Sequence, residues 1–307
     1  DENDANFYIP LIVTDVDADE TPLDPTAAVT LVLKLTDAAG SLLTTAGTLT
    51  VLEHVTGGLN PSNGTFTGNG TAQVTLTGSP QKITETLRYA TGLHYLPAPD
   101  FNGSLQMVAM VEDHGNSGGG ASLMQTVTIP ILVNPVNDPP QLALPGGLTV
   151  AEDASAYFAA IQVSDVDAGE TVGATVRVTL TVDNGVLLVS TGIPGGLNAG
   201  NVSNNNSRSV ILTGTLAAIN TTLANATGVP YRPTANFFGS DTVNVTVSDL
   251  GNTGQPGPQT AVGTVAVNVT PVNDAPLANN DPSLGDPPLT VNEDTVLSVA
   301  GRGVLDN

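Results

Sequence analysis

Residues 136–140 read Val-Asn-Asp-Pro-Pro, and residues 272–276 read Val-Asn-Asp-Ala-Pro. In both copies a strand-like alternating run ends, an Asn-Asp pair follows, and a proline stops the chain from continuing as a regular strand or helix. The two stretches are 136 residues apart (272 minus 136), and the sequence before each one matches at that offset. We interpret them as joints between copies of one domain. The predicted domains are residues 1–138 and 139–274, followed by a linker and the start of a third copy at 275–307.

The charge of the chain favours cations as partners. It has 29 acidic and 7 basic residues and a net charge of -22, so we expect no binding to nucleic acid. Cysteine is absent, which excludes disulfides and thiolate metal sites. Aromatic residues make up 4% of the chain and Trp is absent, a composition typical of turn-rich β-structure. The sequence contains no apolar run of about 18 residues, so we also expect no membrane insertion.

The match between the predicted domains extends beyond the joints. Residues 15–21 and 165–171 share the pattern Asp-Val-Asp-Ala-x-Glu-Thr at an offset of 150 (165 minus 15). The offset falls to 138 (185 minus 47) at the Gly-x-Leu-x-Val stretches 47–51 and 185–189. This change places an insertion in residues 22–46 of the first domain, which we expect to lengthen a hairpin.

The residue patterns predict an all-β fold with short helical exceptions. Residues 79–87 and 215–223 carry apolar residues at i, i+4 spacing, which predicts one short helical turn in each. Residues 243–248 and 265–270 alternate valine with smaller or polar residues, as half-buried antiparallel strands do. Pro130 predicts, for the matching strand of the first domain, either an edge position or a backbone nitrogen that faces outward. The expected fold is therefore a linear array of tandem antiparallel β-sandwich domains.

Carboxylates gather at the ends of the predicted strands. Because Asp165 and Asp167 are two residues apart, we expect both side chains to point to one face. A two-layer sandwich brings this pair to the first joint together with Asp249, which ends the penultimate strand. It leaves Glu152 at the opposite end, beside the second joint. So many like charges are tolerable only around a cation, and oxygen ligands of this kind suit Ca²⁺. The predicted metal ligands are Glu2, Asp15, Asp17, Asp113, Asn137, Asp138, Glu152, Asp165, Asp167, Asp249, Asn273 and Asp274.

A simpler interpretation exists for each acid taken alone, because acids near turns often accept hydrogen bonds from backbone amides. In the loops 112–118 and 248–254, however, we expect Gly and Asn to supply the positive-φ turns without help from Asp113 or Asp249. Recurrence in two copies favours the metal interpretation for the set. The histidines do not recur, so a shared zinc or catalytic site is not expected: they are His54, His94 and His114.

Taken in order, these motifs resemble cadherin-like repeats, particularly those of very large bacterial surface and biofilm adhesins. The joints resemble the cadherin Asn-Asp-x-x-Pro linker, residues 165–167 resemble its Asp-x-Asp, and Asp113 and Asp249 resemble its acid before the final hairpin. Glu2, Glu152 and Glu293 resemble the glutamate of its first strand. The Asp-Arg-Glu motif of cadherins has no counterpart after the Gly-x-Leu strands. The resemblance implies calcium between successive domains and a secreted, cell-surface protein.

We therefore expect a non-enzymatic calcium-binding structural or adhesive array, serving cell-surface adhesion or matrix and filament assembly. Its expected partners are calcium, neighbouring copies or further repeats, and cell-surface glycans or proteins. The alternative is a carbohydrate-binding or carbohydrate-active β-sandwich protein using paired carboxylates. The absence of Trp and the recurrence of the acids in each domain disfavour it.

The C-terminal residues predict a third copy. Residues 291–294 echo residues 150–153, which indicates that the chain is cut inside a longer array. The apolar residues of 287–307 suffice for one or two strands without a sheet to receive them. If this segment is ordered, we expect it to add as strands to a neighbouring copy or to a continuation of the array.

Overall fold

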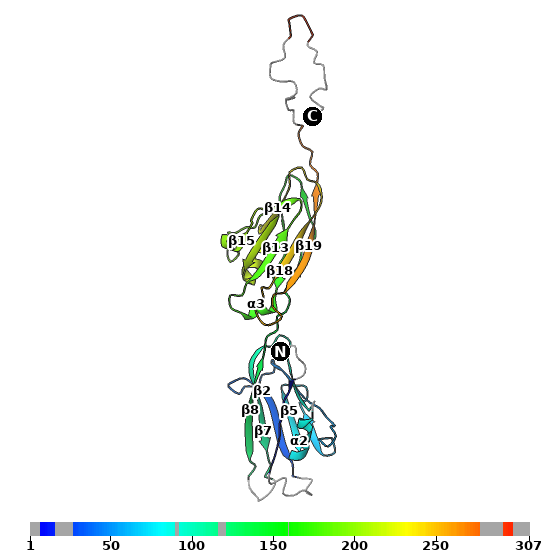
Figure 1. Cartoon of the computed structure of the whole chain (residues 1–307), viewed down its shortest axis with the longest axis vertical. Coiled ribbons are helices and arrows are strands. Elements are labelled where there is room, and N and C mark those ends of the chain that lie inside the picture. The colour runs from blue at the N-terminus through cyan, green and yellow to red at the C-terminus, as the bar shows by residue number, and fades with distance from the viewer. Residues whose placement is uncertain are drawn as a thin grey trace.

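The chain forms two β-sandwiches that follow each other along the sequence (Figure 1). Strands make up most of the regular structure, which confirms the all-β prediction. None of the described helices is long and apolar enough to cross a membrane. The computed structural model describes residues 7–15, 27–89, 92–115, 121–158, 160–276 and 291–296.

The first sandwich pairs a five-stranded sheet, in the order β4-β5-β2-β7-β8, with a three-stranded sheet, β1-β6-β3. Strand β2 places Leu31, Leu33 and Leu35 in the core, because alternate side chains of a strand share a face. Strand β8 carries Pro130 and lies at the sheet edge among the described strands, as predicted. The bounds are β1 Phe7–Tyr8, β2 Val29–Thr36, β3 Gly47–Val51, β4 Gly64–Thr67, β5 Gln73–Gly78, β6 Leu93–Pro97, β7 Gly103–Glu112 and β8 Met124–Val133.

The second sandwich has a six-stranded sheet in the order β10-β19-β18-β13-β16-β15, a three-stranded sheet β11-β17-β14, and the pair β12-β9. Strand β10 runs parallel to β19, and the other described pairs are antiparallel. The alternating valines of β18 and β19 face the core, as predicted. The bounds are β9 Gln141–Ala143, β10 Leu148–Ala151, β11 Ala156–Phe158, β12 Gln162–Ser164, β13 Val176–Thr181, β14 Gly185–Leu187, β15 Val202–Ser203, β16 Ser209–Gly214, β17 Val229–Pro233, β18 Gly239–Ser248 and β19 Thr260–Thr270.

Each sandwich carries one amphipathic helix at the predicted place. The helices are α2 Pro80–Arg88 and α4 Leu216–Leu223, longer than the single turns expected from the i, i+4 spacing. Ser79 and Thr215 cap their first turns, and the apolar pairs at that spacing are fully buried. Two further short elements, α3 Val166–Glu170 and the 3₁₀ turn η1 Ala199–Asn201, occur only in the second sandwich among the described residues.

The sequence insertion of the first domain lengthens the connection between β2 and β3. Residues 37–46 make this connection, whereas residues 182–184 connect β13 to β14. Asp37 holds the start of the longer connection, because its Oδ1 accepts hydrogen bonds from the amides of Ala39 and Ser41. The beginning of the predicted insertion, residues 22–26, lies outside the described residues.

Candidate metal centre at the first joint

The segment between the sandwiches is held against the β18–β19 loop. Val136 forms a parallel bridge with Gln255, and the amide of Asn137 donates to the carbonyl of Gln255 at 2.9 Å. The Gln259 side-chain amide donates to the carbonyl of Asn137. These bonds leave the Asn137 side chain only 2% exposed. The joint is therefore docked on the second sandwich before any ion is considered.

Asp249 organises the loop against which the joint lies. Its Oδ1 accepts hydrogen bonds from the amides of Gly251 and Gln259, both at 2.8 Å. Its Oδ2 accepts from Nδ2 of Asn137 at 2.7 Å, and the residue is fully buried. The positive φ angles of this loop belong to Leu250 and to three glycines, Gly251, Gly254 and Gly257, and none belongs to Asn252. The expectation that Gly and Asn alone make this turn was wrong, because the Asp side chain holds both ends of the loop.

The Asp-x-Asp stretch is helical at its second acid, contrary to the strand-like alternation expected from the sequence. Asp165 is the N-cap of α3, and its Oδ1 accepts from the amide of Ala168 at 2.7 Å. Asp167 lies inside α3, is 2% exposed, and accepts from the amide of Asp138 through Oδ2 at 2.7 Å. The short helix still brings both acids to the joint, because it begins where β12 ends.

Three side-chain oxygens at this joint are buried and have no hydrogen-bond donor. They are Oδ1 of Asn137, Oδ2 of Asp138 and Oδ2 of Asp165. Buried polar atoms without partners are rare, because each one costs the free energy of its lost hydration. All three are acceptors of the kind that coordinates hard cations such as calcium. These three oxygens are therefore candidate cation ligands, and no protein group in the described residues donates to them.

The electrostatics of the joint indicate an excess of negative charge. Burial raises the pKa of the Asp138 carboxyl, and the charges of Asp167 and then Asp100 raise it further. Burial is also the largest cause that raises the pKa of Asp165, with smaller contributions from Asp167, Asp249 and Asp138. The amide of Ala168 opposes that shift through its hydrogen bond. The ionised carboxylates of Asp138 and Asp165 are thus destabilised by burial and by neighbouring acids, which a bound cation would oppose.

The acids are neighbours but do not surround a single point. The described residues contain no group of three or more His, Cys, Asp or Glu side chains arranged to hold a metal ion. One of the three oxygens without donors belongs to the amide of Asn137, so the oxygens at this joint are not all carboxylates. Calcium sites regularly combine carboxylates with amide carbonyls and water. The joint offers carboxylate and amide oxygens, which would have to move closer together to coordinate one ion.

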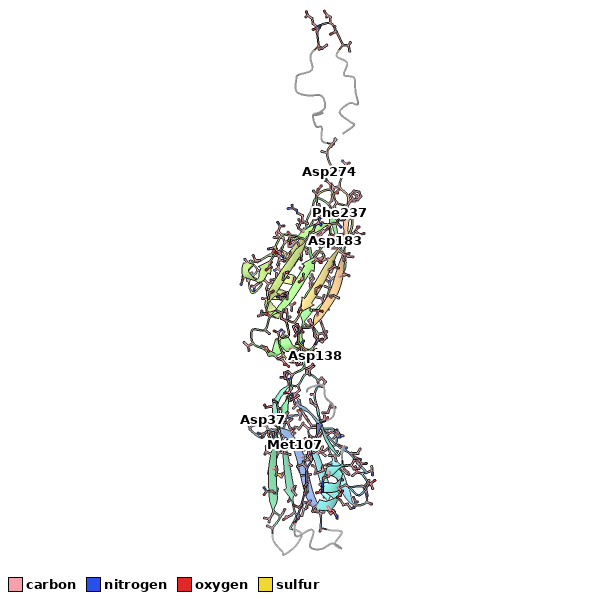
Figure 2. All side chains as sticks on the ribbon, viewed as in Figure 1. Asp37, Met107, Asp138, Asp183, Phe237 and Asp274 are labelled. Atoms are coloured by element: carbon pink, nitrogen blue, oxygen red, sulfur yellow. The ribbon has the colours of Figure 1, made fainter. Side chains whose placement is uncertain are left out.

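Three more of the predicted ligands lie at the end of the second sandwich away from the first joint. Glu152 is 5% exposed, and its Oε1 accepts from the amide of Val272 at 2.6 Å, which places it beside the second joint. Asn273 and Asp274 are exposed there, and Asp274 lies at the end of the second sandwich away from Asp138 (Figure 2).

The end of the first sandwich away from the joint repeats part of this arrangement. Asp15 and Asp113 line one groove there. Oδ1 of Asp113 accepts from the amides of Gly115 and Leu123, both at 2.8 Å. The predicted ligands Glu2 and Asp17 lie outside the described residues.

One part of the joint was missed in the sequence. Asn102, in the β6–β7 connection of the first sandwich, donates from Nδ2 to Oε2 of Glu170 at 2.6 Å, across the joint. Asp100, in the same connection, acts electrostatically on Asp138. Recurrence could not reveal this pair, because the residues at the same offset are Asn236 and Phe238.

No family model and no curated protein sequence matches the chain. Among solved structures, it is similar to human CDH23 EC21-23, with 17% identity over 88% of this chain and 70% of that one and a TM-score of 0.35. For mouse Cadherin-23 EC22-24 the identity is 14% over 79% of this chain and 53% of that one, with a TM-score of 0.32. The C-terminal domain of the Streptococcus agalactiae AgI/II polypeptide BspA is 10% identical over 83% of this chain and 87% of that one, with a TM-score of 0.24. Because these TM-scores are below 0.5, the likenesses carry no argument about function.

Proposed function

We propose that the chain is a length of an extracellular array of cadherin-like repeats, in which calcium binds between successive domains and fixes their relative orientation. The domains end at the joints around residues 138 and 274. The array acts in adhesion at a cell surface or in the assembly of a matrix or filament. Its partners are calcium, neighbouring copies or further repeats, and cell-surface glycans or proteins.

The observation that carries the proposal is the set of three buried oxygens without donors, on Asn137, Asp138 and Asp165. Calcium binds about 6–8 oxygen ligands from carboxylates, amide carbonyls and water. The ion supplies positive charge and coordination. The chain supplies the orientation: the amides of Gly251 and Gln259 hold Asp249, Asp249 holds the Asn137 amide, and the cap of α3 orients Asp165.

Calcium changes the joint by removing repulsion between like charges. Without the ion, Asp138, Asp165 and Asp167 repel one another, and a hydrogen bond from Asn102 to Glu170 links the two sandwiches. Each sandwich has its own apolar core, so neither depends on the ion to fold. Bound calcium therefore acts on the angle between sandwiches more than on the sandwiches themselves.

Calcium titration of the chelated whole chain tests this function. We expect a dissociation constant of about 10⁻⁴ to 10⁻³ M, as in extracellular modules. At calcium about 100 times that constant, the bound state gains about 2.7 kcal/mol, and the melting temperature rises. In small-angle scattering, calcium should narrow the range of maximum dimensions that the chain adopts, because the angle between the sandwiches varies less. The β-sheet signal in circular dichroism should stay unchanged.

A matched pair of variants assigns the effect to the joint. Asp165→Asn with Asp167→Asn removes two charges but keeps side-chain acceptors for the α3 cap and the Asp138 amide. This double variant should abolish the calcium-dependent rise in melting temperature. Asp183→Asn, at the far end of the second sandwich in Figure 2, should leave the rise intact. A full rise in the double variant would contradict the proposed ligands.

The carbohydrate alternative gains no support from the described residues. The close ring contact there, between Phe158 and Tyr231, is buried in the core, where no sugar can reach it.

A further inference from the structure

The last strands of the two sandwiches differ in what lies along their outer edges. Strand β8 corresponds to β19 at the 136-residue offset (260 minus 124), and each pairs antiparallel with the strand before it. Strand β10 lies along the outer edge of β19, where Val150 pairs with Val269 and is 5% exposed. Among the described strands, none pairs with the outer edge of β8. This edge of β8 can therefore receive a strand where β19 receives β10.

An apolar groove of about 500 Å³ lies between β8 and residues 11–15. The exposed side chains of Ile12 and Val127 lie on its two walls. In the second sandwich β9 fills the corresponding place, and Leu142 and Leu144 pack there against the core. The groove of the first sandwich therefore has the position of the β9 site.

Helix α2 already holds one wall of the groove in the position of a strand. Oγ1 of Thr84 accepts from the amide of Val13 at 2.9 Å and donates to its carbonyl at 2.7 Å. In the second sandwich the side chain of Asn220 makes the same two bonds to Val163, at 2.9 and 2.8 Å. Val163 belongs to β12, which pairs with β9 on its other side. The backbone around Val13 is thus placed to pair as β12 does.

The C-terminal tail, residues 283–296, repeats the sequence of β10. Residues 289–291 and 148–150 both read Leu-Thr-Val, and Glu-Asp follows one residue later in both. Residues 291–296 of the tail are described, and the backbone bond from Thr295 to Asn292 has its equivalent in the bond from Ala154 to Ala151. Val291 is 50% exposed, although the equivalent Val150 is buried. The tail therefore has the pattern of β10, and its apolar side chain is not covered by the described residues.

The tail also matches β8 in side-chain volume. A Cβ atom on Gly263 of β19 would lie within 3.2 Å of the side chains of the two leucines of the β9 site, so only glycine fits beneath them. Strand β8 carries Val127 at that position. At the 141-residue offset of the tail (289 minus 148), the two leucines are replaced by Ser283 and Gly285. Smaller residues on the tail thus leave room for the larger residue on β8, as close packing requires.

We infer that the outer edge of β8 and its groove bind residues 283–291 of a second copy of the chain, as a strand parallel to β8. The register of β10 on β19 predicts Leu289 beside Ile131 and Val291 beside Val133. The inference rests on the proposed function, in which neighbouring copies are partners, and names the surface that joins them head to tail.

Two other ways of covering this edge are less favourable. Figure 1 shows residues 291–296 and the first sandwich at opposite ends of the molecule, so the tail of the same chain does not reach β8. A symmetric pairing of two β8 strands would run past Pro130, which has no N–H to donate. The parallel register begins at Ile131 and avoids it.

Sedimentation velocity of the whole chain at increasing concentrations tests the inference, at an ionic strength that screens repulsion between acidic chains. We expect oligomers that lengthen with concentration. Val291→Asp places a charge where the bound strand would be buried, and association should weaken about tenfold or more. Val296→Asp adds the same charge to the tail outside the bound segment, at a side chain that is 91% exposed, and should change nothing. Both variants should fold, because neither residue belongs to a sandwich.

Engineered thiols test the register, because the chain has no cysteine of its own. The inferred register puts residue 290 beside residue 132, as Thr149 lies beside Asn268. Mixing the Thr290→Cys and Leu132→Cys variants under mild oxidation should therefore give a disulfide-linked dimer. Mixing Thr290→Cys with Val262→Cys, which is exposed on the second sandwich, should not.

The outcomes separate this inference from the proposed function. A chain that stays monomeric while calcium still raises its melting temperature overturns the inference and leaves the function standing. Equal weakening by Val291→Asp and Val296→Asp also overturns it, since the effect would then be one of charge. A disulfide formed by Leu132→Cys alone, and not by the mixture, overturns it in favour of symmetric β8 pairing. Association that depends on Val291 in a chain without any calcium response supports the inference, while the calcium part of the function fails.

Discussion

Asp249 in the second sandwich and Asp113 in the first hold their loops with the same two bonds. Each accepts through Oδ1 from the amide two residues later and from the amide ten residues later, at 2.8 Å in all four cases. They differ in what lies over them. Asn137 covers Asp249 and bonds to its second oxygen, whereas the described chain places no such segment over Asp113, which is half-buried.

This comparison separates two roles of one residue. Holding the loop needs a single oxygen and occurs at both ends. Joining the domains uses the other oxygen and occurs where a linker is docked. The interpretation of these acids as turn-forming residues and their interpretation as parts of a metal centre are therefore both compatible with one side chain.

The largest predicted effect is a difference in lost stability between the sandwiches when Asp249 and Asp113 are each replaced by alanine. Asp249→Ala leaves the amides of Gly251 and Gln259 without their acceptor, at about 1–3 kcal/mol for each unsatisfied group, and removes one of the two acceptors of Nδ2 of Asn137. Asp113→Ala leaves its two amides open to water, so the loss of stability should be smaller than for Asp249→Ala. Hydrogen exchange of β18 and β7 amides reads each sandwich separately. Equal losses of hydrogen-exchange protection in the two variants would mean that the segment around Asn137, which covers Asp249, adds no stability.

Asp249→Asn is the matched control for that experiment. It keeps the Oδ1 acceptor for the loop amides but places an amide group opposite Nδ2 of Asn137. Most of the protection of the loop amides from hydrogen exchange should remain, while the contact between residue 249 and Asn137 weakens.

When calcium is removed by a chelator, the stability contributions of Asp165 and Asp113 should depend on pH with opposite signs. The pKa of Asp165 is raised, mainly by burial and then by neighbouring acids, so the folded chain binds this proton more strongly than the unfolded chain. The second sandwich should gain stability as pH falls through the raised pKa, and the gain should level off below the ordinary Asp value of about 4. The pKa of Asp113 is lowered by the amides of Leu123 and Gly115, so its contribution is lost as pH falls from about 4 through the folded pKa.

Scanning calorimetry from neutral to acidic pH checks these signs with two variants. Asp165→Asn should reduce the gain to the part that the raised pKa of Asp138 contributes, and Asp113→Asn should remove the loss at lower pH. An undiminished gain in Asp165→Asn would assign it to the other acids of the joint.

The smallest effect should come from the bond that crosses the joint. Asn102→Ala removes an exposed hydrogen bond to Glu170. Its effect on the free energy of unfolding should be within about 0.5 kcal/mol of zero. The range of interdomain distances, measured with spin labels on β5 and β16, should nevertheless widen. Phe238→Ala, at the equivalent position of the second sandwich, is the control. No widening would show that this bond does not restrain the joint.

The sequence predicted the features that follow from local pattern. The alternating strands, the two short helices and the edge strand at Pro130 follow from periodicity and proline chemistry. The structure places Asn137, Asp138, Asp165, Asp167 and Asp249 near one another, as expected from strand direction, whereas their role as metal ligands stays a prediction. Asp100 was invisible because its counterpart is Asn236, and recurrence was the signal used. The helical turn at Asp167 was missed because a capping Asp165 favours helix over the strand alternation assumed for that stretch.

The parallel pairing of β10 with β19 has a mechanical consequence. Leu148 to Ala151 lie beside Val267 to Thr270 in the same direction, so the chain enters this pair at one end and leaves it at the other. A pull that reaches β10 from its amino end and β19 from its carboxyl end slides the two strands past each other. Their hydrogen bonds are then loaded together in shear and cannot open one at a time. Resistance of this kind is set by the rate of unfolding under force and is separate from the equilibrium free energy of the sandwich.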